Sequence, residues 1–169
     1  MAYPAQPEDL FARLDELGIR THTVQHPPVF TVEEAKALRG ELPGGHIKNL
    51  FLRNKKGEMW LVVADEDRTL DLKALGDRLG AGRLSFGSPD RLMTYLGIIP
   101  GAVTPFAVIN DRDRQVRVVI DAGLMAHSPV HCHPLTNAMT TAIEPSDLLT
   151  FIRACGHEPE ILDLANAGA

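Results

Sequence analysis

Several features are scarce in this chain of 169 residues, and each scarcity narrows the class of protein. There are only two cysteines, Cys132 and Cys155, and an intracellular chain of this size does not need them bridged. No apolar run approaches the roughly 20 residues that span a bilayer. Where a signal peptide would place basic and then apolar residues, the chain has Pro4, Pro7 and the acidic pair 8–9. These absences predict a cytoplasmic protein with no membrane partner.

What is present is typical of one globular domain over residues 1–169. Hydrophobic residues make up 44% of the chain and charged residues 23%, which excludes collagen, coiled coils and wholesale disorder. A chain of this length buries about 70% of its unfolded surface and can hold a core without disulfides or metals. We therefore expect a single self-supporting domain.

The charge is unevenly distributed along the chain. The net charge of −5 argues against a general nucleic-acid binder, and we expect no specific DNA partner. Residues 46–120, however, hold 12 basic against 9 acidic residues, while both flanking segments are acidic. A local basic field can act even when the total charge has the opposite sign.

Hydrophobic periodicity and caps predict alternating helices and strands, and therefore an α/β or α+β domain with a mixed sheet. We expect helices over 7–17, 31–39, 71–79, 88–97 and 146–154, the last capped by Ser146. We expect strands over 20–25, 46–53, 58–64, 106–109, 115–120, 130–133, 139–143 and 159–164. The second and third strands should form one hairpin, and the fourth and fifth another. The acidic run 65–67 should be solvated surface.

A lysine and an asparagine interrupt an otherwise apolar strand directly after a double glycine. Lys48 should share a strand face with Leu50 and Leu52, and Asn49 the opposite face with Phe51. A lysine in such a strand is costly unless its ammonium faces a cavity or a partner. The simpler interpretation is a stem lying on the sheet with its head in water.

Two further segments are candidates for chemistry. His131 and His133 share one strand face, and with Cys155 and His157 they suggest zinc, although the usual spacing of a zinc site is missing. An orienting histidine is the other interpretation, because histidine titrates near neutrality. The Gly/Pro-rich segment 97–105 can clasp a ligand with its backbone N–H groups, or can be a plain connector.

Taken together and in order, these features resemble the YbaK/ProRS-associated superfamily of aminoacyl-tRNA deacylases. Within it the chain is most similar to the freestanding alanyl-tRNA(Pro) deacylases, ProXp-ala or PrdX. The likeness covers about residues 7–155. It rests on four blocks: His26-Pro27-Pro28 with TVEEA at 31–35, Gly45-x-x-Lys48-Asn49-Leu50-Phe51-Leu52-Arg53, Gly101-x-Val103-x-Pro105, and His133-Pro134-x-x-Asn137.

The resemblance implies a mixed, barrel-like sheet flanked by helices, no cofactor and no metal, and hydrolysis of Ala-tRNA(Pro) to alanine and free tRNA(Pro). Lys48 would hold the terminal phosphate or the ester oxygens, Asn49 would donate to the substrate and order the water, and His133 would orient the amino end or the water. The substrate would be bound by further residues: Phe30, Thr31, Val32, Gly101, Ala102, Val103 and Asn137.

The resemblance also gives the basic middle segment a use. The acceptor-stem phosphates would meet four basic residues, Arg53, Lys55, Lys56 and Arg83, and prolyl-tRNA synthetase is a candidate transient partner. Three alternatives stay open at this point. They are a deacylase of another mischarged tRNA of the cysteine or serine/threonine type, a non-catalytic tRNA-binding or regulatory module, and a zinc protein.

Overall fold

The computed structural model of the chain describes residues 3–28 and 44–164. Three of the expected substrate-binding residues, Phe30, Thr31 and Val32, lie outside the described residues. So does the helix expected over 31–39. In the described part no helix is both long and apolar enough to cross a membrane.

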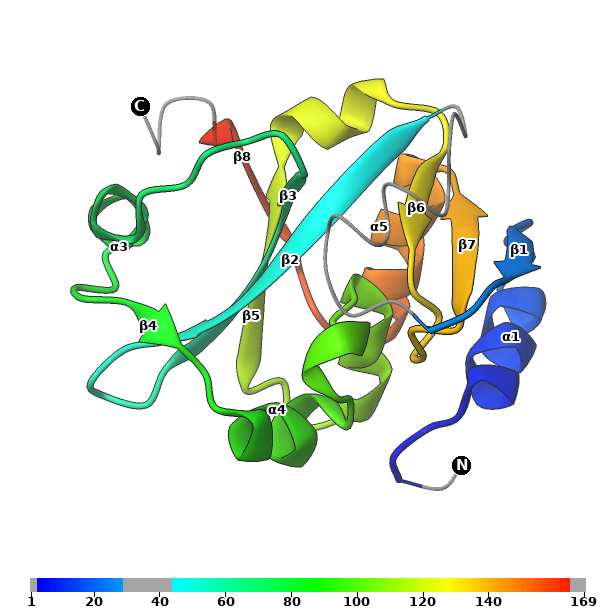
Figure 1. Ribbon diagram of the computed structural model, residues 1–169, viewed down its shortest axis with the longest axis horizontal. Coiled ribbons are helices and arrows are strands. Elements are labelled where there is room, and N and C mark those ends of the chain that lie inside the picture. The colour runs from blue at the N-terminus through cyan, green and yellow to red at the C-terminus, as the bar shows by residue number, and fades with distance from the viewer. Residues whose placement is uncertain (1–2, 29–43, 165–169) are drawn as a thin grey trace.

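Eight strands of the described residues form one mixed sheet, in the order β1-β7-β6-β2-β3-β5-β8, with β4 also paired to β2 (Figure 1). The strands are β1 (His22–Gln25), β2 (Gly45–Arg53), β3 (Met59–Asp65), β4 (Ser85–Phe86), β5 (Val116–Asp121), β6 (Val130–Cys132), β7 (Met139–Ile143) and β8 (Glu160–Leu162). The predicted mixed sheet flanked by helices is confirmed.

Strand β2 joins the two parts of this sheet. It pairs antiparallel with β3 from Ile47 to Arg53, but it pairs with β6 only at Gly45 and His46, in parallel. The double glycine before it is needed for close packing: a Cβ on Gly45 would lie 2.6 Å from the His127 ring, and one on Gly44 would lie 2.4 Å from the Pro129 carbonyl oxygen. These glycines let the chain before β6 approach β2.

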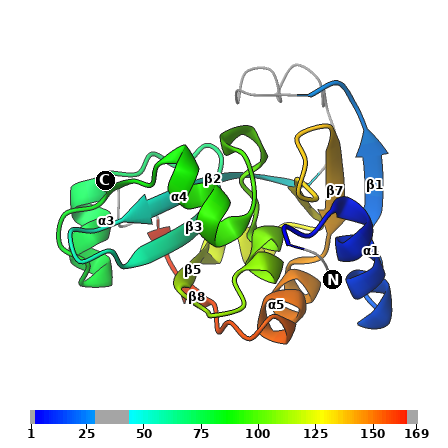
Figure 2. The ribbon, with the colours of Figure 1, turned by 90° about the horizontal axis from the view of Figure 1, so that it is seen from below.

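Helices cover both faces of the sheet. The α-helices are α1 (Pro7–Glu16), α3 (Leu72–Leu79), α4 (Pro89–Leu96) and α5 (Pro145–Ala154), and the 3₁₀ helices are η1 (Pro100–Ala102), η2 (Pro105–Asn110) and η3 (Ala122–Ala126). Helix α3 packs through Leu75 on the face of β2 and β3 that carries Leu52 and Trp60. Helices α1, α4 and α5 enclose the larger core on the other side, and Figure 2 places α3 and α1 at opposite ends of the molecule.

The expected capping residues are mostly correct. Asp71 and Ser88 accept hydrogen bonds from Lys73 N–H and Arg91 N–H, and so begin α3 and α4. Helix α5 begins earlier than predicted, with Glu144 as its N-cap, because Pro145 occupies the first helical position that proline favours. Ser146 is therefore inside the helix.

The predicted second hairpin is wrong. The apolar residues 106–109 form part of η2, a 3₁₀ helix that begins at Pro105, where Thr104 Oγ1 accepts from Phe106 N–H at 3.3 Å. Strand β5 pairs in parallel with β3 and β8 instead. The predicted hairpin of β2 and β3 is confirmed, and the first six residues of β3 are buried.

Candidate functional site

The first half of β2 places Lys48 and Asn49 on opposite faces of the strand. Lys48 is half-buried, and its ammonium donates a hydrogen bond to the backbone carbonyl of Arg68 in the segment after β3. Its head is therefore held by the protein, which differs from the simpler interpretation of a stem with its head in water. Between residues 44 and 164 Lys48 forms no ion pair with a carboxylate.

Asn49 connects β2 to the Gly/Pro-rich segment. Its Nδ2 donates to the Val103 carbonyl at 3.1 Å. This contact fixes the amide orientation, because only the nitrogen can donate to a carbonyl. The amide oxygen Oδ1 is buried and has no hydrogen-bond partner among the described residues. An orphaned buried acceptor is rare and calls for an explanation, and here it lies at a candidate site.

The segment that holds Val103 has a defined backbone. Helix α4 ends at Gly97, whose φ of 65° is left-handed and whose Cβ, if present, would lie 2.7 Å from Asn110 Nδ2. The turn η1 follows, closed by Ala102 N–H donating to the Ile99 carbonyl at 3.0 Å. Gly101 and Val103 are half-buried and Ala102 is buried. The segment is therefore a rigid loop beside Asn49.

His133 follows β6 and has a defined tautomer. Its Nδ1 lies 3.0 Å from the Met139 carbonyl, so Nδ1 carries the proton and Nε2 is the acceptor of the neutral ring. Burial lowers the pKa of His133 below its ordinary value of 6.5, and His26, whose ring centroid lies 6.3 Å away, adds to the lowering. Asn137, in the same β6–β7 connection, is buried.

The four basic residues expected to bind tRNA gather at the other end of β2. Lys55 and Lys56 are exposed in the turn to β3, and Arg83 is exposed in the segment before β4. Arg53 pairs with Ser85 of β4, and its Nε is buried with no hydrogen-bond partner in residues 3–28 and 44–164. Arg53 is five positions along the strand from Lys48, a span of about 17 Å.

The residues of the zinc interpretation serve other contacts. His131 stacks on His46 with ring centroids 4.8 Å apart, and His157 lies 2.9 Å from Asp111. Burial raises the pKa of Cys155 to about 11, which disfavours a thiolate ligand. In the described ranges no group of three or more His, Cys, Asp or Glu is arranged to hold a metal ion.

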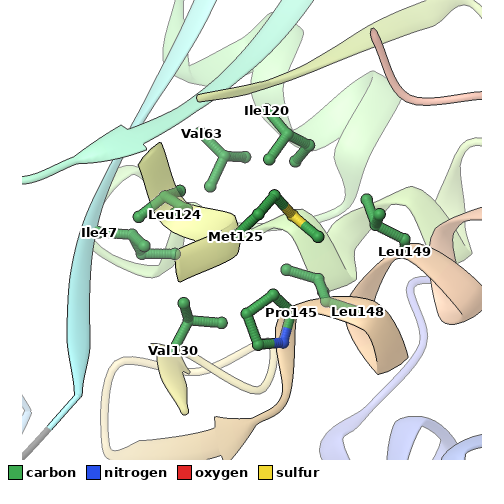
Figure 3. Close-up of a pocket in the computed structure, with 9 residues that line it drawn as sticks. All are labelled: Ile47, Val63, Ile120, Leu124, Met125, Val130, Pro145, Leu148 and Leu149. Atoms are coloured by element: carbon green, nitrogen blue, oxygen red, sulfur yellow. The ribbon is translucent and has the colours of Figure 1, made fainter. Parts of the chain in front are cut away.

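A small cavity of about 10 Å³ lies in the core beneath Ile47 (Figure 3). Its lining is apolar and comprises Ile47, Val63, Ile120, Leu124, Met125, Val130, Pro145, Leu148 and Leu149. A cavity of this size holds at most about one water, and a water needs polar partners. It is therefore a packing void and not a substrate site.

Sequence reasoning missed a set of polar contacts beside Lys48. The segment 65–67 is a fixed turn, not plain solvated surface: Asp65 accepts from His127 at 3.2 Å, and Glu66 N–H donates to the His46 carbonyl at 3.0 Å. Asp121 is fully buried and paired with Arg68 at 3.1 Å. In the sequence, the only indication of this buried pair is that Asp121 ends the mostly apolar strand 116–121.

Comparisons with known proteins agree with this arrangement. The family model for the aminoacyl-tRNA editing domain matches residues 26–151. The chain is 42% identical to the prolyl-tRNA editing protein ProX of Acetoanaerobium sticklandii, over 92% of this chain and 95% of that protein. It is 41% identical to the mouse prolyl-tRNA synthetase associated domain-containing protein 1, over 92% and 94% of the two chains.

The fold has solved counterparts as well. One is the crystal structure of a protein provisionally assigned as a trans-editing enzyme for prolyl-tRNA synthetase, with a TM-score of 0.72 and 21% identity over 96% of this chain and 98% of that one. At that identity the likeness concerns the fold alone. The family match and the two relatives decide the assignment: this chain belongs to the aminoacyl-tRNA editing domain family.

Proposed function

We propose that this chain hydrolyses Ala-tRNA(Pro), releasing alanine and free tRNA(Pro). Members of its family edit aminoacyl-tRNA, and the 42% identical relative is named a prolyl-tRNA editing protein. These names support a deacylase that acts in trans on mischarged tRNA(Pro). The choice of alanine is our inference from the resemblance and from a size argument given below.

The observation that carries the proposal is the presence of two consecutive polar residues, Lys48 and Asn49, in β2 just beyond its short pairing with β6. Lys48 is held by a neutral carbonyl rather than by a carboxylate of the described residues, so its charge is available to an anion. Asn49, on the other face of the strand, has a buried acceptor that no described residue uses. A fixed cation suits an ester that develops negative charge on one oxygen while water attacks its carbon.

The proposed reaction is a simple ester hydrolysis. A water oxygen bonds to the carbonyl carbon of the aminoacyl group, the bond from that carbon to the ribose oxygen breaks, and the ribose oxygen takes up a proton. Lys48 stabilises the oxyanion or the terminal phosphate, and Asn49 Oδ1 accepts a hydrogen bond from the water. The neighbouring 2′-hydroxyl of the ribose helps to activate that water, because none of the proposed site residues is a strong general base.

His133 is proposed to hold the amino end of the substrate or the water. Its neutral Nε2 is an acceptor, and both the α-ammonium group and water are donors. The lowered pKa keeps this acceptor available at neutral pH. The Gly101–Val103 backbone and Asn137 complete the proposed walls of the aminoacyl pocket.

Selectivity for alanine follows from size. A synthetase pocket built for proline cannot strongly reject a smaller side chain, because each methylene discriminates by only about 1–3 kcal/mol. A second, smaller pocket accepts alanine and excludes proline by steric clash. Phe30, Thr31 and Val32 are proposed to set the size of that pocket.

The tRNA itself is proposed to lie along β2. With the terminal ester at Lys48, Arg53 stands about 17 Å away along the strand, and acceptor-stem phosphates would reach it together with Lys55, Lys56 and Arg83. We further propose that the protein acts in the cytoplasm, with prolyl-tRNA synthetase as a transient partner. The binding should weaken linearly in log affinity with log salt.

The test is deacylation of Ala-tRNA(Pro) by Lys48→Ala beside a matched control. We expect kcat to fall about 100-fold or more, the usual effect of removing one group that stabilises the oxyanion. Lys73→Ala removes an exposed lysine of α3 and should leave the rate unchanged. Undiminished deacylation by Lys48→Ala would overturn the assignment of the site.

A further inference from the structure

The carbonyl that receives Lys48 belongs to a turn that is fixed at both ends. Arg68 N–H donates to the Asp65 carbonyl at 3.0 Å, which closes the four-residue turn. Glu66 N–H donates to the His46 carbonyl at 3.0 Å, which ties the turn to β2 two residues before Lys48. The position of the Lys48 ammonium is therefore set by the turn at 65–68.

One buried carboxylate holds both ends of this turn. Asp121, the last residue of β5, is 0% exposed and accepts from Asp65 N–H at 3.2 Å. It also accepts from Arg68 Nε at 3.1 Å and from Arg68 Nη2 at 3.4 Å. The fold leaves room for this pair at Gly123, where a Cβ would stand 3.0 Å from Arg68 Nη2.

The pair is electrically balanced, and that matters for its neighbour. Burial raises the pKa of Asp121, but the Arg68 guanidinium and the backbone N–H groups of Asp65 and Gly123 outweigh it, so the pKa stays below the ordinary 3.8. The carboxylate remains charged and is neutralised by the Arg68 guanidinium. Lys48 is therefore held by the Arg68 carbonyl and not by the Asp121 carboxylate.

We propose that the Asp121–Arg68 ion pair positions Lys48 for catalysis by fixing the turn whose Arg68 carbonyl holds the ammonium. This inference rests on the proposed function of Lys48. Neither Asp121 nor Arg68 touches the substrate in this account, so both are positioning residues. A lysine ammonium has three donors, and with one on the carbonyl two remain for the phosphate or ester oxygens.

The experiment measures kcat and KM for Ala-tRNA(Pro) with Arg68→Ala. The substitution leaves the backbone carbonyl in place and removes the guanidinium that pairs the turn with Asp121. We expect kcat to fall about 10- to 100-fold, the scale on which a misplacement of about 1 Å reduces a rate, with KM unchanged. Arg68→Lys, which can still reach Asp121 with one donor, should recover part of the loss.

The matched control is Arg117→Ala. Arg117, a residue of β5, also pairs with a carboxylate, that of Glu58 at 3.0 Å, but on the exposed surface. Its removal should leave kcat and KM unchanged. Thermal melting is recorded for each variant. If Arg68→Ala melts below the assay temperature, Arg68→Lys is tested instead, and the proposal requires a lowered kcat with an unchanged KM.

Three results would overturn the proposal. Unchanged kcat in Arg68→Ala would show that the turn needs no anchor. A raised KM with a shallower salt dependence would show that Arg68 contacts a tRNA phosphate itself. A further loss of kcat or affinity when Arg68→Ala is added to Lys48→Ala would show that Arg68 does not act through Lys48. Normal activity of Lys48→Ala would instead mean that the proposed function has failed.

Discussion

A buried aspartate contacts each end of strand β5, and the two aspartates have different partners. Asp111, just before the strand, accepts from Gln115 N–H at 3.0 Å, Val116 N–H at 2.8 Å and His157 Nε2 at 2.9 Å. Both side chains of the Asp111–His157 pair are only 4% exposed. Asp121, at the other end, pairs with Arg68, whose side chain is 28% exposed.

Under the proposed role of Lys48, the difference separates a residue of the stable core from one that positions the site. The Asp111 pair ties the start of β5 to the segment after α5 and lies outside the group of contacts around Lys48. The Asp121 pair ties the end of β5 to the turn that holds Lys48. Two buried carboxylates with similar hydrogen bonds are therefore expected to have different roles, because their partners lie in different parts of the fold.

Replacing Asp111 should have the largest effect on stability and none on the chemical step. Asp111→Ala breaks a buried pair and leaves two backbone N–H groups unpaired, which should lower the free energy of unfolding by about 3–5 kcal/mol. Urea unfolding at pH 7 measures this, and kcat of the folded fraction should equal that of the unmodified chain. Asp113→Ala, an exposed neighbour, should stay within about 0.5 kcal/mol. A changed kcat in Asp111→Ala would remove the contrast with Asp121.

Acid should destabilise the protein through both aspartates. Burial raises the pKa of Asp111, but its hydrogen bonds with His157 and with two backbone N–H groups outweigh this effect, so the pKa lies below 3.8. The pKa of Asp121 is also lowered. The unfolded chain binds protons at the ordinary 3.8 and the folded chain only below it, so stability is present above 3.8 and is lost as the pH falls through the lowered values. Urea unfolding from pH 6 to pH 2 should follow this course, and Asp111→Asn should flatten it. A slope unchanged in Asp111→Asn would contradict the assignment.

The pKa values of both aspartates are far below neutrality, so we expect the pH dependence of the activity between pH 5 and pH 7 to come from His133. This should be the smallest of the effects. Because burial lowers the pKa of His133 below 6.5, the neutral ring persists into mildly acidic solution. The acid limb of kcat/KM for Ala-tRNA(Pro) should therefore have a midpoint below 6.5 and should vanish in His133→Gln. Folding stability should also fall with the pH in this window, since the unfolded histidine binds its proton first. A midpoint above 6.5 would place the ring in a different environment.

Local patterns predicted those parts of the molecule that neighbouring residues decide. The hairpin of β2 and β3 follows from an apolar run after a turn, and the start of α4 follows from Ser88 before Pro89. Lys48 and Asn49 stood out because they are polar in an apolar strand. The hairpin predicted over 106–120 failed because β5 has only parallel partners, β3 and β8, which local spacing cannot identify.

The anchor of Lys48 could not be predicted for the same reason. Arg68 and Asp121 are 53 residues apart, and neither forms a motif with its chain neighbours. The close contact of the double glycine with the chain around His127 likewise depends on a distant segment. Such pairings depend on how distant segments pack, and only the folded structure supplies that information.

The most direct test of the account is a deacylation panel with Ala-, Cys-, Ser- and Pro-tRNA(Pro). The unmodified chain should hydrolyse Ala-tRNA(Pro) fastest and leave Pro-tRNA(Pro) intact, and Lys48→Ala should abolish the difference. Faster hydrolysis of Cys- or Ser-tRNA(Pro) would contradict the proposed choice of alanine. Failure to hydrolyse any of the four would contradict the central claim that this chain is a tRNA(Pro) deacylase.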